Sequence, residues 1–170
     1  WMEMEIMRSG RIHYMRFERG VPVTSSGSSD APLTIKGDTD TTGTVIRFQP
    51  DETIFSTTTF EFDRLHARLS QLAFLNKGLK IELVDERDER RDVLFYEGGI
   101  VSYVEHLNRN REALHKDVIY FASLMEVTGP EGQPVEVDVE VALQWTGAFS
   151  ESIYCFANNV YNDEGGTHAS

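Results

Sequence analysis

Residues 44–50 read TVIRFQP and residues 58–78 read TTFEFDRLHARLSQLAFLNKG, and these two stretches predict a strand followed by a helix. In the first stretch Thr44, Ile46 and Phe48 occupy every second position, so their side chains point to one face of a strand. The proline that follows cannot donate to a sheet ladder and is typical of a strand end. The sequence therefore predicts a strand over residues 44–48.

The second stretch carries the signals of an amphipathic helix. Thr58 and Glu61 have the spacing of a capping box. Leu65, Leu69 and Leu72 then recur at helical spacing, and a glycine at position 78 stands where a left-handed C-cap would end the helix. The leucine stripe predicts packing against a sheet or a second helix.

Alternation predicts further strands around this pair. Residues 1–17 are typical of a hairpin that turns at Ser9-Gly10, and residues 79–96 of a second hairpin with a charged turn. Between them, residues 20–43 are rich in Ser, Thr, Gly, Asp and Pro, which predicts a long surface loop. Ile100, Tyr103, Val104 and Leu107 define a short amphipathic helix.

Beyond that helix the pattern is all β. Residues 118–121 predict a short strand, residues 135–145 a long strand with one acidic face, and residues 153–157 a further strand. We expect an antiparallel meander with one side in water. The whole chain is then of the α+β class, with a domain division between about residues 99 and 115.

Composition limits the classes of function. The chain has 170 residues, 40% of them hydrophobic, so it predicts a globular protein of one domain or two small ones. It contains no apolar run long enough to span a membrane and no signal peptide, and we expect a soluble, cytoplasmic protein. The net charge of −12 argues against a surface that neutralises many phosphates. The ends do not resemble natural termini, which predicts an internal piece of a longer protein.

The residue types that usually perform chemistry are scattered. The five histidines lack the spacing of a zinc site on a helix, and Cys155 is predicted to be a small buried hydrophobe because no base accompanies it. The acidic runs at 85–92 and 136–140 read as solvated faces, with cation binding as the alternative. Gly98-Gly99 and Gly165-Gly166 are weak candidates for phosphate contacts. On the residues alone, no active site is predicted.

Six segments, taken together, resemble the family of bacterial DNA gyrase B subunits, with the ATPase subunit of topoisomerase IV as a near neighbour. They occur in family order and extend over nearly the whole chain. The segments are TGTVIRF at 42–48, LAFLNKG at 72–78, YEGGI at 96–100, VALQW at 141–145, YCFANN at 154–159 and GGTH at 165–168.

This resemblance implies an arrangement of domains. Residues 1–99 would form the C-terminal part of a GHKL ATPase domain, which is an α/β sandwich. Residues 100–114 would form a linking helix and boundary. Residues 115–170 would begin the transducer domain, a ribosomal-protein-like β-α fold. The loop around residues 21–31 looks longer than the usual family version.

The resemblance also implies a nucleotide site. Thr44 would read the adenine edge together with an aspartate and a water, Ile46 would be an apolar wall of the pocket, and Arg8 would stand at the rim where coumarin-type inhibitors lean. The alternative for Thr44 and Ile46 is ordinary inward strand packing, and for Arg8 a solvated surface charge. The family's catalytic glutamate, magnesium-binding asparagine and glycine-rich lid would precede this chain, and its phosphate-reaching glutamine and lysine would follow it. No catalytic or metal-binding residue is therefore expected here.

The function implied is that of an ATP-dependent type IIA DNA topoisomerase. The parent protein would use ATP and Mg²⁺, dimerise through its B subunits on ATP binding, and supercoil DNA negatively with the gyrase A subunit. The chain alone is predicted neither to hydrolyse ATP nor to bind it well. Two alternatives stay open: the ATPase subunit of topoisomerase IV, and a non-catalytic α+β module whose acidic strand face docks a basic partner.

Overall fold

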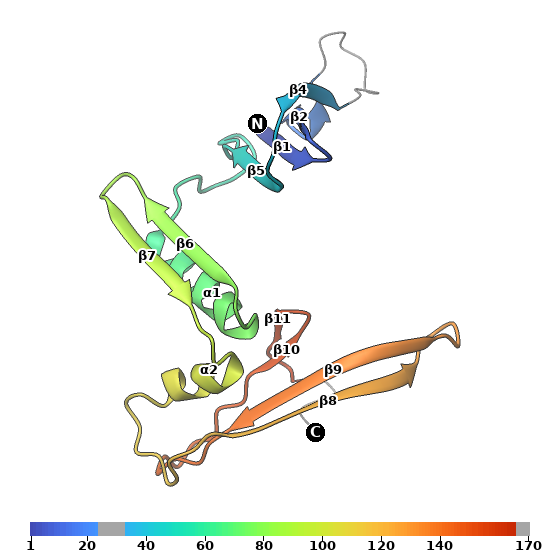
Figure 1. Ribbon diagram of the computed structural model, residues 1–170. Coiled ribbons are helices and arrows are strands. Elements are labelled where there is room, and N and C mark those ends of the chain that lie inside the picture. Colours follow the sequence, from blue (N-terminus) through green and yellow to red (C-terminus); the bar gives the residue numbers. More distant parts are fainter. Residues whose placement is uncertain (24–32, 166–170) are drawn as a thin grey trace. The chain divides into compact units, whose positions relative to one another are not determined.

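A computed structural model describes residues 1–23 and 33–165 (Figure 1). Two compact units divide the chain, Trp1–Phe60 and Glu61–Ser170. The GGTH segment after Gly165 and most of the loop at 21–31 lie outside the described residues. Within the described part no helix is long and apolar enough to cross a membrane.

The first unit is built on one antiparallel sheet with the order β3-β2-β1-β5, in which β4 also pairs with β2. Its strands are β1 (Met2–Arg8), β2 (Arg11–Glu18), β3 (Val21–Pro22), β4 (Thr34–Asp38) and β5 (Gly43–Phe48). The hairpin and the strand predicted over residues 1–17 and 44–48 are confirmed.

The β1–β2 turn is local chemistry that the sequence displays directly. Ser9 and Gly10 both have positive φ, 53° and 76°, as a two-residue hairpin turn of the primed type requires. The surface loop predicted over most of residues 20–43 contains two strands, β3 and β4. Both pair with β2, which gives their backbone groups partners.

The second unit combines two helices with three separate hairpins in its described part. The elements are α1 (Phe62–Leu75), β6 (Lys80–Asp85), β7 (Arg90–Phe95), α2 (Ile100–Leu107), β8 (Ile119–Thr128), β9 (Pro134–Leu143), β10 (Cys155–Ala157) and β11 (Val160–Asn162). Helix α1 packs against the β6–β7 hairpin and against α2 (Figure 1).

The start of α1 differs from the prediction. The helix begins at Phe62 after an extended Glu61 that makes no side-chain cap, so the capping box at Thr58 is wrong. The chain before it instead turns Phe60 edge-on to Phe48, with ring centroids 5.8 Å apart. Gly78 does have a positive φ of 83°, but the helix already ends at Leu75.

The core of the second unit is small and centred on α1. The buried hydrophobic residues among those described are Ala73, Phe74, Leu94 and Cys155. Cys155 is thus confirmed as a buried small hydrophobe. In the predicted leucine stripe, Leu69 and Leu72 are half-buried and Leu65 is 36% exposed. Phe74 faces Tyr96 and α2, because its ring stacks on those of Tyr96 and Tyr103.

The predicted meander is wrong, because β8 and β9 form an isolated ribbon (Figure 1). The ladder runs without a break from Ile119↔Leu143 to Thr128↔Pro134, so β8 extends seven residues beyond Phe121, where the sequence predicted its end. Cross-strand pairing overrides the weak strand propensity in the middle of β8. Trp145 lies beyond β9, and among the residues that the structure describes β10 pairs with β11 alone.

Candidate functional site: one face of the N-terminal sheet

Strand register gathers apolar side chains on one face of the sheet in the first unit. Thr44 lies opposite Ile6, and Ile46 lies opposite Met4. Directly paired residues share a face, so these positions belong to one surface. We call this surface the apolar sheet face; its members are Met2, Met4, Ile6, Met15, Phe17, Ile35, Ile46 and Phe48.

All three residues predicted to border a nucleotide lie on this face. Alternation along β1 places Arg8 on the side of Ile6, next to the position opposite Thr44. The side chains of Arg8, Thr44 and Ile46 are exposed, and Ile46 is 54% accessible. The structure therefore brings the three residues to the same surface, and their contact with adenine stays a prediction.

The opposite face of the sheet neutralises its own charges. Arg16 Nη1 lies 2.6 Å from Glu3 Oε1, and Lys36 Nζ lies 2.7 Å from Glu5 Oε1. The hydrogen bond from Arg16 lowers the pKa of Glu3, and the hydrogen bond from Lys36 lowers the pKa of Glu5. Both carboxylates are therefore paired within the sheet. The apolar sheet face remains as the surface that a ligand could cover.

One polar cluster of this unit escaped the sequence analysis. Asp51 Oδ1 accepts hydrogen bonds from the backbone N–H and the hydroxyl of Thr53, at 2.8 and 2.6 Å, while Arg19 Nε donates to Oδ2 at 3.0 Å. The bonds from Thr53, with that from Arg19, lower the pKa of Asp51 to about 2. The Asp-x-Thr sequence at 51–53 could have predicted the turn. Arg19 could not have been predicted as its partner, because it lies 32 residues earlier in the chain.

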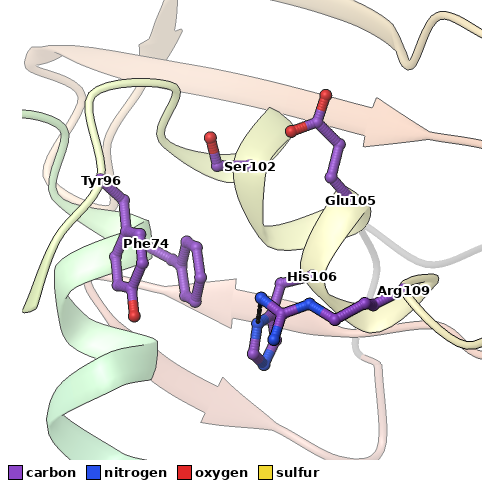
Figure 2. A pocket seen from close by; sticks show the side chains of 6 residues that line it. All are labelled: Phe74, Tyr96, Ser102, Glu105, His106 and Arg109. Carbon is purple, nitrogen blue, oxygen red and sulfur yellow. Dashed lines mark hydrogen bonds between the residues drawn. The ribbon is translucent and has the colours of Figure 1, made fainter.

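The second unit has a shallow hollow of about 250 Å³ beside helix α2 (Figure 2). Its floor is Phe74, whose ring stacks on Tyr96 with centroids 3.5 Å apart and lies 5.3 Å from the ring of His106. Arg109 donates to Nδ1 of His106 at 3.2 Å. The six lining residues are Phe74, Tyr96, Ser102, Glu105, His106 and Arg109. The sequence does not reveal the hollow, because its lining comes from α1, from α2 and from the segments just after β7 and α2.

One glycine of the pair at the start of α2 has a backbone explanation. Gly99 adopts a φ of 58°, whereas a Cβ on Gly98 would meet only the side chain of Ser102, whose hydroxyl can rotate away. The left-handed backbone accounts for Gly99 without a phosphate. Over residues 1–23 and 33–165, no group of three His, Cys, Asp or Glu side chains is placed to hold a metal ion. Gly166 and His168 lie outside the described residues.

Known proteins resemble this chain along nearly its whole length. The family model described as DNA gyrase B matches residues 99–170. The B subunit of DNA gyrase from Halalkalibacterium halodurans is 48% identical over 99% of this chain and 24% of its own length. The B subunit of DNA topoisomerase 4 from Bacillus subtilis is 43% identical over 100% of this chain and 24% of its own.

A solved structure shares the fold. The crystal structure of the 43K ATPase domain of Thermus thermophilus gyrase B, in complex with an aminocoumarin, matches with a TM-score of 0.72 and 28% identity, covering 95% of this chain and 40% of that one. The α+β fold, with its one-sided apolar sheet, is that of part of a gyrase-type ATPase domain. The chain is homologous to the B subunits of DNA gyrase over nearly its whole length. It spans about a quarter of the length of both curated relatives named above.

Proposed function

We propose that this chain is part of the B subunit of an ATP-dependent type II DNA topoisomerase. Within that subunit it would join the nucleotide pocket to the transducer domain. The observation that carries the proposal is 48% identity to the B subunit of a gyrase over 99% of the chain. The whole protein would hydrolyse ATP with Mg²⁺ in the cytoplasm, dimerise through its B subunits, and pass one DNA duplex through another together with the gyrase A subunit.

The proposed division of labour follows the chain. Residues 1–99 would complete the ATPase domain, residues 100–114 would link it to the next domain, and residues 115–170 would open the transducer. The start of the family match at residue 99 supports this boundary. The compact units divide elsewhere, between Phe60 and Glu61, because α1 contacts both the β6–β7 hairpin and α2.

The apolar sheet face would supply one wall of the nucleotide pocket. A hydroxyl at Thr44 can donate to or accept from a purine edge, and the branched side chain of Ile46 can cover the purine ring. Arg8, at the end of β1, would add a positive charge at the rim. No cluster of acidic ligands stands near this face in the described part, so no step through Mg²⁺ is assigned to these residues.

A single hydroxyl deletion tests the nucleotide wall in the full-length protein. Thr44→Val keeps the shape of the side chain and removes its hydrogen bond, so ATP binding should weaken by roughly 3- to 10-fold. Thr34→Val makes the same change on the opposite face of the sheet, since Thr34 pairs with Tyr14, and it should leave ATP affinity unchanged. Calorimetric titration with a non-hydrolysable ATP analogue measures both. Equal affinities for Thr44→Val and the wild type would refute the assignment.

Topoisomerase IV is the alternative that the comparisons support, because the chain is 43% identical over its whole length to the corresponding protein from Bacillus subtilis. The two functions differ in the product made from DNA. The full-length protein, reconstituted in turn with the A-type partner of each class, should supercoil relaxed plasmid with the gyrase partner. Efficient decatenation with the other partner, without supercoiling by either, would favour topoisomerase IV.

A further inference from the structure

We propose that Asn159 is a positioning residue that fastens the β10–β11 hairpin to the C-terminal end of helix α1. Asn159 Nδ2 donates to Oδ1 of Asn76 at 3.0 Å, across 83 residues of chain. Its backbone carbonyl accepts a hydrogen bond from Arg68 Nη2 at 3.2 Å. We call these three residues, Arg68, Asn76 and Asn159, the asparagine latch.

The orientation of Asn76 is fixed from the helix side. Its Nδ2 donates to the carbonyl of Leu72 at 2.7 Å, and its backbone N–H donates to the same carbonyl at 3.1 Å. A helix end leaves its last carbonyls without intrahelical partners, and Asn76 satisfies one of them. With Nδ2 used in this way, Oδ1 faces outward and can only accept. It therefore selects a donor, and the side chain of Asn159 supplies it.

The turn of the hairpin presents Asn159 in the required direction. Asn158 and Asn159 form the two-residue connection between Ala157 and Val160, with φ values of 47° and 66°. Both values are left-handed, and asparagine tolerates that region better than most residues. The two asparagines thus share a backbone role, but the latch uses only Asn159.

A second contact, through the ring of Tyr103, holds the β10–β11 hairpin in one orientation relative to α1. Tyr103 of α2 lies between the core and the hairpin, with its ring 5.2 Å from Phe74 and 6.3 Å from Phe156 of β10. Gln71 of α1 donates to the Tyr103 hydroxyl at 3.4 Å. One polar and one aromatic attachment together fix both the position and the orientation of β10–β11 relative to α1.

The mechanistic meaning of the latch rests on the proposed function. Helix α1 falls in the proposed ATPase portion, and β10–β11 falls in the proposed transducer portion. A displacement of α1 that accompanies nucleotide binding would then be transmitted to the hairpin through Asn76 and Asn159. The contact between the side chains of Asn76 and Asn159 is neutral, so it can be made and broken without leaving an unpaired charge buried.

The test compares two neighbouring substitutions in the full-length protein. Asn159→Asp directs a carboxylate oxygen at Oδ1 of Asn76, whereas Asn158→Asp adds the same charge one residue away with the same left-handed backbone. Asn159→Asp should raise amide hydrogen exchange of Cys155–Ala157 and Val160–Asn162 by roughly 10-fold or more. Exchange in β6–β7 should not change. Equal effects of the two variants, or no effect of Asn159→Asp, would overturn the latch.

A rescue variant separates the latch from general destabilisation. Adding Asn76→Ala to Asn159→Asp removes the opposing oxygen, so hairpin exchange should fall back toward the level of Asn76→Ala alone. An additive rise would contradict the proposed contact. ATP turnover is the independent readout: Asn159→Asp should lower kcat and leave KM for ATP unchanged. A wild-type protein without ATP turnover would refute the proposed function, while the exchange result would still decide the latch.

Discussion

Phe74 is the most deeply buried large side chain of helix α1. It is 2% exposed and contacts the rings of Tyr96, Tyr103 and His106. An aromatic side chain buries at least ~150 Å², and at ~25 cal/mol per Å² the loss of this burial costs about 4 kcal/mol. This agrees with the range of about 3–5 kcal/mol for Phe→Ala in protein cores. Phe74→Ala should therefore remove most of the stability of the second unit.

Leu65→Ala is the matched control on the same helix. Leu65 belongs to the leucine stripe that the sequence predicted as the packed face, but it is 36% exposed, so the expected cost is about 1 kcal/mol. Urea unfolding followed by circular dichroism gives the free energy of unfolding for both variants. If Leu65→Ala costs as much as Phe74→Ala, the packed face of α1 is the leucine stripe and the assignment of the core is wrong.

Two further predictions test backbone and charge. Gly78→Ala should destabilise the chain by about 1–2 kcal/mol, because φ is +83° with open space around it, whereas Gly37→Ala, also in open space but without a positive φ, should be neutral or slightly stabilising; unfolding measurements that rank them otherwise would contradict this. Asp51 has a depressed pKa in the folded state, so its contribution to stability is complete above the ordinary value of 3.8 and is lost as the pH falls to about 2. Asp51→Asn should lower stability at neutral pH and flatten its dependence in that window, and an unchanged profile would rule out the hydrogen-bonded carboxylate.

Local sequence patterns were sufficient to predict the strands in which apolar and polar residues alternate regularly. The hairpin over residues 1–17 follows from its alternation and from Ser9-Gly10, and the strand at 44–48 from alternation alone. Neither needs information from distant residues, because turn chemistry and face assignment are properties of a few neighbours. The family resemblance then supplied the placement of the candidate nucleotide residues, which no local pattern could have given.

Elements whose limits depend on distant partners were not predictable in the same way. Helix α1 starts four residues after Thr58, because Phe60 packs on Phe48 instead of entering the helix. Strand β8 continues to Thr128 because β9 pairs with it along its whole length. The asparagine latch is a contact between residues 83 positions apart, and it carries no signature in either segment.

Thr44 and Ile46, the two residues predicted to line the nucleotide pocket, are both exposed in the first unit. An inward-facing strand residue that served only the core of its own unit would be buried, as Leu94 of β7 is at 2% exposure. Ile46 is 54% exposed, and Thr44 beside it on the same face is exposed as well. Neither side chain is therefore buried within the described part of this chain. They are available to a ligand or to another segment of a longer protein, and an altered ATP affinity of Thr44→Val is the result that would assign them to the ligand.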